Sequence, residues 1–456
     1  MDLVIKNGRV VTAGDVFEAD IGVAGEKIVA IGEGLAGAQV IDAAGRLVFP
    51  GGVDVHVHLQ MPLGEGLVSR DDFASGSIAA ACGGTTTIID FVEAERGVSL
   101  LEATRQRRAE AEGRCAIDYG LHLTGNCAEP AFLDEIGALA GQGYTSLKLY
   151  TTYEGLRVED AEILALLETA RRRGLLPIVH AENHAIIQLE QRRLLAAGCR
   201  EPRYHPLSRP AWAEAEAAGR VLALARSVGV PVYFVHVSAA ETLEVIARAR
   251  RTGQAVYAEV TPQHLLLDDA EYARPGFEGA RFCCAPPLRT KADQEALWRG
   301  LAAGAVQTVA TDHCPWDYAT DRQRGRDDFT KTPNGLAGIE TRLALLYTEG
   351  VAAGRLSLNR FVDVCATTPA KLFGLYPQKG SIIVGGDADL VIWNAGAQWV
   401  LAAGRLHMRT DDCPFDGWSV RGRVAWGLLR GQVIVREGEF VGPAGGGRFV
   451  ARRPGG

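Results

Sequence analysis

DAEILALLETARRRGLLPIVH, residues 160–180, is the stretch from which the fold class can first be predicted. Residues 160–173 are predicted as a helix, because apolar residues recur there at the spacing of one helix face and Gly174 stands where a helix can end. Those apolar residues are Ile163, Leu164, Leu166, Leu167 and Ala170. Residues 175–180 form a short apolar run that is typical of a buried strand. A helix that leads into a buried strand indicates an α/β protein.

The same alternation of helix and strand continues along the chain. Ser238 and Glu241 are predicted to form a capping box at the start of a helix that should end near Gly253. The other predicted elements are helices over 213–227 and 290–300 and strands over 232–237, 255–260 and 306–311. Strands joined through helices predict a parallel sheet, and more than about 300 residues of this pattern favour a closed (β/α)8 barrel of the TIM type. Periodicity alone leaves an open sheet as the alternative.

Both ends of the chain are predicted to be all-β. Short strands are expected over residues 3–6, 9–12, 19–23 and 27–31, and again over residues 389–393, 424–429 and 433–436. Asn7-Gly8 separates the first two and favours a type I′ hairpin, because both positions of that turn need a positive φ.

The composition excludes several classes of protein. With 48 Lys and Arg against 55 Asp and Glu, the 456-residue chain has a formal net charge of −7, which predicts neither a nucleic-acid nor a membrane partner. The nine cysteines contain no CxxC pair, which argues against a disulfide framework and favours a reducing compartment. The first residues, MDLVIK, lack the regions of a signal peptide. We therefore expect a cytoplasmic protein.

His56 and His58 are the first candidates for chemistry. On a strand their side chains point to one face, but two such histidines alone are more often a surface pair than metal ligands. Three further candidates, His180, His236 and Asp312, follow or end predicted strands. The carboxyl ends of barrel strands build the active face, so these residues together favour a metal site.

Lys148 lies near the end of another predicted strand, in YTSLKLY at residues 144–150. Its ammonium form cannot bind a metal, and an exposed or ion-paired lysine is the simpler interpretation. A deprotonated lysine can instead add carbon dioxide and become a carbamate. A carbamate behaves as a carboxylate and could bridge two cations.

Together these residues resemble the cyclic amidohydrolases, specifically the hydantoinase/dihydropyrimidinase branch. The motifs that carry the resemblance are HVH at 56–58, Lys148 with Tyr153 five residues later, VHAEN at 179–183, FVHVSA at 234–239, TDHCP at 311–315, TPNG at 332–335, KLFGL at 371–375 and GGDADL at 385–390. They extend along essentially the whole chain. The resemblance implies a (β/α)8 barrel over residues 51–376 and a smaller β-sandwich domain built from residues 1–50 and 377–456.

The resemblance also implies a centre with two zinc ions, for which manganese or cobalt are alternatives. Carbamylated Lys148 (N6-carboxylysine) and a hydroxide would bridge the two ions. The other ligands would be His56, His58 and Asp312 at the first ion, and His180 and His236 at the second.

Four residues are implied to act on the substrate. Asp312 would move a proton from the nucleophile to the departing ring nitrogen, and the phenol of Tyr153 would stabilise the oxyanion. Ala285 and Asn334 would bind the substrate through backbone groups. Serine is common at the position of Ala285, a departure that matters little if only the backbone is used.

The implied activity is opening of the ring amide of 5-substituted hydantoins or dihydropyrimidines to N-carbamoyl amino acids. The expected partners are a small cyclic amide or imide and further copies of the chain in a tetramer or dimer. Allantoinase is the alternative, whereas Gln60 stands where dihydroorotase-like sequences commonly place an arginine. A non-catalytic scaffold related to dihydropyrimidinase is less favoured, because all six implied ligand positions are filled.

Overall fold

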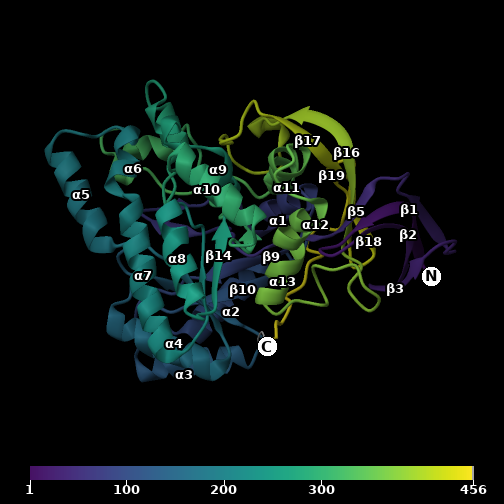
Figure 1. Ribbon diagram of the computed structural model, residues 1–456, viewed down its shortest axis with the longest axis horizontal. Coiled ribbons are helices and arrows are strands. Elements are labelled where there is room, and N and C mark those ends of the chain that lie inside the picture. The colour runs from purple at the N-terminus through teal and green to yellow at the C-terminus, as the bar shows by residue number, and fades with distance from the viewer. Residues whose placement is uncertain (454–456) are drawn as a thin grey trace.

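Eight parallel strands form the central sheet of the computed structural model, which describes residues 1–453 (Figure 1). In sheet order they are β6 (Gly52–Asp54), β9 (Thr85–Val92), β10 (Asp118–Thr124), β11 (Ser146–Tyr150), β12 (Leu176–His180), β13 (Val232–Phe234), β14 (Val256–Val260) and β15 (Thr308–Val309). Arg342 joins the two outer strands, because its Nη1 donates to the carbonyls of Val53 (3.0 Å) and Val309 (2.8 Å). The predicted (β/α)8 barrel is confirmed.

Helices cover the outside of this sheet, as α3, α4, α7 and α8 do in Figure 1. The longer helices are α1 (Phe73–Cys82), α2 (Leu100–Ala111), α3 (Pro130–Ala140), α4 (Asp160–Arg173), α5 (His184–Ala196), α7 (Ala211–Val228), α8 (Ala240–Arg251) and α10 (Lys291–Ala302). The shorter ones are α6 (His205–Ser208), α9 (Pro262–Leu266), α11 (Arg342–Leu346), α12 (Leu358–Val362) and α13 (Thr368–Leu372). Helix α4 has the predicted bounds and ends at Gly174, whose φ is +67°. Within residues 1–453, no helix has the length and apolar character needed to cross a membrane.

The start of α8 differs from the prediction. Ala239, not Ser238, is the residue that precedes the helix, and the predicted capping box is absent from this helix. The hydroxyl of Ser238 donates instead to the carboxylate of Glu214 on α7. Asp293 of α10 accepts a hydrogen bond from the N–H of Ala240 at 2.9 Å. The backbone N–H of Ser238, which Glu241 would bind in a capping box, donates to Glu214 at 3.0 Å. Neighbouring helices therefore satisfy N–H groups at the start of α8.

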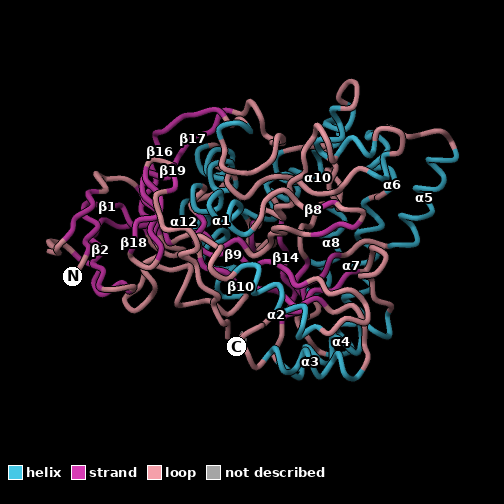
Figure 2. The backbone as a smooth tube through the Cα atoms, turned by 180° about the vertical axis from the view of Figure 1, so that it is seen from behind, coloured by secondary structure: helices cyan, strands magenta, loops and turns pink. Residues whose placement is uncertain are grey.

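Strands from both ends of the chain form a second, mixed sheet. These strands are β1 (Leu3–Val11), β2 (Val16–Ala24), β3 (Lys27–Gly32), β4 (Gln39–Asp42), β5 (Leu47–Pro50), β16 (Leu390–Val400), β17 (Ser419–Leu429), β18 (Gln432–Arg436) and β19 (Glu439–Phe440). Antiparallel pairing of β5 with β16 joins the two ends, and Figure 2 shows this strand-rich part beside the helix-rich barrel. The predicted terminal β domain is confirmed, while its boundaries at residues 50 and 377 stay a prediction.

The hairpin predicted at Asn7-Gly8 is wrong. Strand β1 runs through both residues, and its register to β2 shifts between Ile5 and Gly8. Of the two residues only Asn7 has a left-handed φ, +55°, whereas a type I′ turn needs two. A single left-handed residue produces a bulge in the strand and not a reversal. At Gly8 a side chain would meet Val48 of β5 at 2.7 Å, so close packing also explains this glycine.

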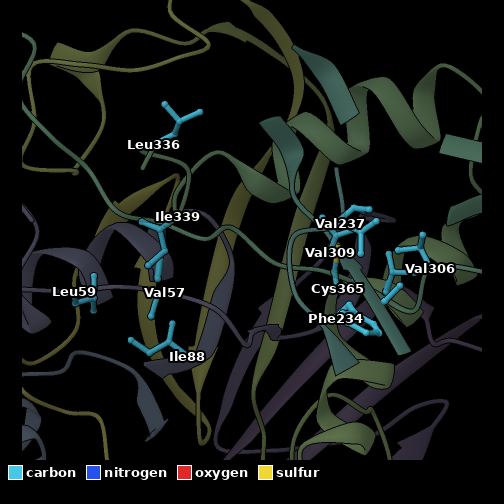
Figure 3. Close-up of a cluster of buried hydrophobic side chains, with 14 of the residues drawn as sticks. Val57, Leu59, Ile88, Phe234, Val237, Val306, Val309, Leu336, Ile339 and Cys365 are labelled. Carbon is cyan, nitrogen blue, oxygen red and sulfur yellow. The ribbon is translucent and has the colours of Figure 1, made fainter. Parts of the chain in front are cut away.

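A buried apolar layer fixes the direction of the two histidines that follow β6. Val57 is fully buried and lies between Ile88 and Ile339 in Figure 3. Successive side chains of an extended chain point to opposite sides. Since Val57 points into this apolar layer, His56 and His58 point away from it.

Lys379 lies at the centre of a buried ion cluster between the barrel and the terminal sheet. Its Nζ is 2.5 Å from Asp118, 2.9 Å from Asp387 and 2.7 Å from Asp389. The three carboxylates are close enough to one another to hold a cation, and the ammonium of Lys379 takes that place. The three aspartates raise the pKa of Lys379 although burial opposes its charge, so the lysine stays protonated.

Replacing Lys379 by methionine is expected to destabilise the protein by about 3–5 kcal/mol, because three buried carboxylates lose the ammonium that they share. Urea unfolding followed by circular dichroism measures this loss. Lys27→Met is the matched control, since Nζ of Lys27 also contacts Asp387 at 2.5 Å but its side chain is 45% exposed. That exposed pair is expected to contribute less than about 1 kcal/mol. Equal losses in the two variants would contradict the prediction.

Candidate metal centre

His56 and His58 follow the carboxyl end of β6 and pair there with the chain beyond β15. The N–H of Asp312 donates to the carbonyl of His56 at 2.9 Å, and the N–H of His58 donates to the carbonyl of His313 at 2.8 Å. This pairing brings the three side chains together. Nε2 of His56 is 3.2 Å from Nε2 of His58, and Oδ1 of Asp312 is 3.1 Å and 3.3 Å from these two nitrogens. The three residues form a group that could hold a metal ion.

His180 and His236 form a second group at the same end of the barrel. His180 ends β12, and His236 follows β13 by two residues. Their ring centroids are 4.6 Å apart, and that of His236 is 5.4 Å from the ring of His56. Nδ1 of His236 is buried and has no hydrogen-bond partner within residues 1–453. A buried nitrogen without a partner is costly, so this ring fits a metal ligand.

Lys148 lies on β11 and is only 1% exposed. Its Nζ is 5.0 Å from the ring centroids of Phe91 and Tyr150, and among the residues that the structure describes it forms no ion pair within 4.0 Å. Burial lowers the pKa of Lys148 to about 8, although nearby carboxylates act in the opposite direction. About one-tenth of an amine with this pKa is neutral at pH 7, and the neutral form is the one that adds carbon dioxide.

The ionisation states of Asp312, His180 and His236 suit a bound cation. Burial opposes ionisation of Asp312, but His56 and His58 hold the pKa of its carboxyl well below the usual range. Burial lowers the pKa of both His180 and His236, and the nearby ammonium of Lys148 contributes to the shift. Asp312 is therefore a carboxylate and the two histidines are neutral, which are the forms that bind metals.

Three candidate residues have a left-handed backbone. The φ angles are +74° at Tyr153, +34° at His236 and +52° at Asp312. This region is sparsely populated by residues other than glycine, and it is a true outlier for a bulky aromatic residue such as Tyr153. Such strain is concentrated at functional sites, where the surrounding structure holds it. The barrel thus aims these side chains at the centre at some cost in backbone energy.

Tyr153 lies beside the second histidine group. Its ring centroid is 5.0 Å from that of His180, and its hydroxyl makes no hydrogen bond to any residue from 1 to 453. Burial raises the pKa of Tyr153, so the phenol keeps its proton. A protonated hydroxyl without a partner can donate a hydrogen bond to a substrate oxygen.

Ala285 and Asn334 lie on two segments that run beside the chain after Asp312. The N–H of Gly335 donates to the carbonyl of Cys283 at 3.1 Å, and that of Cys314 donates to the carbonyl of Leu336 at 3.0 Å. Within the described residues 1–453, the backbone N–H groups of Ala285 and Asn334 have no hydrogen-bond partner. These groups are free to bind a ligand, and the role of Ala285 and Asn334 in substrate binding stays a prediction.

A profile described as the Amidohydrolase family matches residues 47–434. The chain belongs to the amidohydrolase family. It is 44% identical over 455 residues to a D-hydantoinase of Ralstonia pickettii and 45% identical over 456 residues to a D-hydantoinase of Geobacillus stearothermophilus. The alignments cover 99% of this chain in both cases, and 99% and 97% of these relatives.

Solved structures agree with this assignment. The structure of the dihydropyrimidinase from Brevibacillus agri superimposes with a TM-score of 0.98 at 44% identity and covers all of both chains. The L-hydantoinase from Arthrobacter aurescens superimposes with a TM-score of 0.91 at 34% identity, over 99% of this chain and 100% of that one. The resemblance to the hydantoinase/dihydropyrimidinase branch of the amidohydrolases is confirmed. The amidohydrolase family is generally metal-dependent, in agreement with the cluster of His56, His58 and Asp312.

Two carboxylates of this amidohydrolase were not predicted from sequence. Glu259 on β14 accepts a hydrogen bond from Nδ1 of His56 at 2.7 Å, and Glu182 accepts one from Nε2 of His180 at 2.7 Å. Both are buried. An acidic residue inside the otherwise apolar strand VYAEV was the available signal for Glu259. Buried acidic residues in barrel strands need a partner, and a histidine at the active face is one.

Proposed function

We propose that this amidohydrolase opens the ring amide of 5-substituted hydantoins and dihydropyrimidines by hydrolysis and yields N-carbamoyl amino acids. One observation carries the proposal: the chain is about 45% identical over its whole length to D-hydantoinases and has metal-ligating side chains grouped at the active face of its barrel. The substrate is a small cyclic amide or imide.

The centre is proposed to hold two zinc ions, with manganese or cobalt as ions that accept the same ligand types. Carbamylated Lys148 would contribute to both positions. The other ligands would be His56, His58 and Asp312 for the first ion, and His180 and His236 for the second. When bound, such ions polarise a carbonyl oxygen and lower the pKa of water to about 7.

The protein groups have distinct roles in this proposal. Water adds to the ring carbonyl carbon, and the carboxylate of Asp312 accepts its proton and passes it to the ring nitrogen as the C–N bond breaks. The hydroxyl of Tyr153 donates to the carbonyl oxygen as negative charge develops there. The free backbone groups of Ala285 and Asn334 orient the ring beside Asp312.

Hydrolysis of allantoin is not favoured, because the relatives and solved structures named above match along the whole chain and are hydantoinases and dihydropyrimidinases. A scaffold without turnover is not favoured either, since five of the six proposed ligand positions carry histidine or aspartate and the sixth is Lys148, which would bind as its carbamate. Assembly into a tetramer or dimer and a cytoplasmic location stay predictions.

A substrate panel tests the proposed function. The metal-loaded enzyme is expected to turn over dihydrouracil or a hydantoin with an apolar 5-substituent at least about 10-fold faster than allantoin, whose hydantoin ring carries a polar ureido group, or dihydroorotate, whose dihydropyrimidine ring carries a carboxylate. Release of the N-carbamoyl amino acid is followed by chromatography for the D and L hydantoins separately. Enzyme from which a chelator has removed the metal is the negative control. Preference for allantoin, or no turnover of any ring by enzyme with bound metal, would contradict the proposal.

A further inference from the structure

Glu259 lies near the end of β14 and is fully buried. Its Oε1 accepts two hydrogen bonds, from Nδ1 of His56 at 2.7 Å and from the backbone N–H of His236 at 3.0 Å. Its Oε2 accepts a third from the hydroxyl of Tyr233 at 2.7 Å. One carboxylate therefore contacts a residue from each of the two histidine groups of the metal centre.

The contact with His56 determines which ring nitrogen faces the centre. Because Nδ1–H donates to Glu259, the nitrogen left for a metal is Nε2, which points to Asp312 at 3.1 Å. A carboxylate that accepts from the far nitrogen of a histidine fixes the tautomer and the ring orientation and makes the ligand more basic. Glu259 therefore fixes the tautomer and the ring orientation of His56.

The contact with His236 acts on the backbone. The φ of His236 is +34°, in a region that residues other than glycine rarely adopt. The hydrogen bond from its N–H to Glu259 helps to hold this conformation. Since the ring of His236 is itself fully buried and lies 4.6 Å from that of His180, a relaxed backbone would move a ligand of the second group.

Glu182 offers a contrast within the same site. It accepts from Nε2 of His180 at 2.7 Å and from Nη1 of Arg209 at 2.6 Å. Among the residues from 1 to 453 it makes no hydrogen bond to His56, His58 or Asp312. Its influence is thus confined to the second group.

We propose that Glu259 is a positioning residue that couples the two metal positions, because the same carboxylate oxygen orients His56 at the first and holds the backbone of His236 at the second. The inference rests on the assignment of these histidines under the proposed function. It predicts that loss of the Glu259 carboxylate weakens both metals together, whereas loss of the Glu182 carboxylate weakens one.

Zinc titration against a competing chelator, in the presence of bicarbonate, tests this coupling without any activity measurement. The variants are Glu259→Gln and Glu182→Gln. Glu340→Gln is the matched control, because Glu340 is also buried and accepts from Nδ1 of His407 (2.9 Å) and from the backbone N–H of His407 (2.6 Å), away from the proposed ligands. Circular dichroism and the melting temperature of the metal-free proteins report whether each variant folds.

The wild type and Glu340→Gln are expected to bind two tight equivalents of zinc. Glu259→Gln is expected to weaken both equivalents at least about 10-fold, and Glu182→Gln only one. If Glu259→Gln weakens one equivalent or none, the coupling is overturned. Should that variant not fold, Glu259→Asp is measured instead, with the same two outcomes. A wild type that binds less than one equivalent contradicts the proposed function itself, so the two failures are distinguishable.

Discussion

Replacing Asp312 by alanine is expected to abolish ring opening and to leave the fold intact. The carboxylate is the group proposed to move the proton from water to the departing nitrogen, and such transfer contributes about 100-fold to 10,000-fold in rate. It also lies within 3.3 Å of both His56 and His58, so its loss removes a proposed metal ligand as well. Turnover is therefore expected to fall at least about 100-fold, measured as release of the N-carbamoyl product.

Asp327→Ala is the control for this variant. Asp327 is an exposed residue of a loop. The activity of the Asp327→Ala enzyme is expected to stay within about 2-fold of the wild type, because most surface substitutions have small effects. The metal content of both variants is measured beside the activity. If Asp312→Ala keeps more than a tenth of the wild-type rate, Asp312 does not have the proposed role.

Replacing Lys148 by alanine is expected to remove both metals and all measurable turnover. The lysine is buried without an ion-pair partner within the described residues, and its carbamate would be a ligand of both ions. Metal analysis after dialysis is expected to give less than about one zinc per chain, since loss of a ligand weakens the site directly. Wild-type metal content in this variant would contradict the carbamate.

Two further measurements separate the carbamate from a simple packing role for Lys148. A short carboxylate such as propionate is expected to restore part of the turnover of Lys148→Ala, because it can supply the missing ligand oxygens. Wild-type enzyme prepared without metal and bicarbonate is expected to regain activity only when both are added. Failure of propionate together with full reactivation by zinc alone would show that no carbamate is needed.

The rate of that reactivation is expected to rise with pH. Burial lowers the pKa of Lys148 to about 8, so the amine is mainly protonated below this pH and mainly neutral above it. Only the neutral amine adds carbon dioxide. From about pH 6.5 to about pH 8.5 its neutral fraction rises about 25-fold, and reactivation at constant dissolved carbon dioxide should rise with it. A rate that falls over this range would contradict the assignment.

The barrel and the proposed ligands were predictable because each helix, each strand and each residue at a strand end can be recognised from its own stretch of sequence. Helix α4 was predictable because its apolar residues recur with a period of about 3.6 residues and Gly174 follows the last of its turns. The ligands were visible because the carboxyl ends of parallel strands converge, so that residues far apart in sequence, such as His56 and Asp312, meet whenever the barrel closes.

The features that were missed depend on partners from other elements. Ser238 does not cap α8, because Glu214 of α7 binds its hydroxyl. Glu259 is distant in sequence from His56, and only closure of the barrel brings the two side chains to 2.7 Å. Asn7 has the φ that a turn requires, but Gly8 packs closely against β5 and β1 continues through a bulge. In each case a tertiary contact determines the outcome.

The pairing of β5 with β16 has a consequence for how the protein is made. The whole barrel lies between these two strands in the sequence. At about 5–20 residues per second, a ribosome needs on the order of tens of seconds to synthesise that interval. Throughout this time β5 has emerged without its partner, and an unpaired strand edge is a template for aggregation. The nascent chain must therefore shield its first strands, by its own folding barrel or by a chaperone, until β16 arrives.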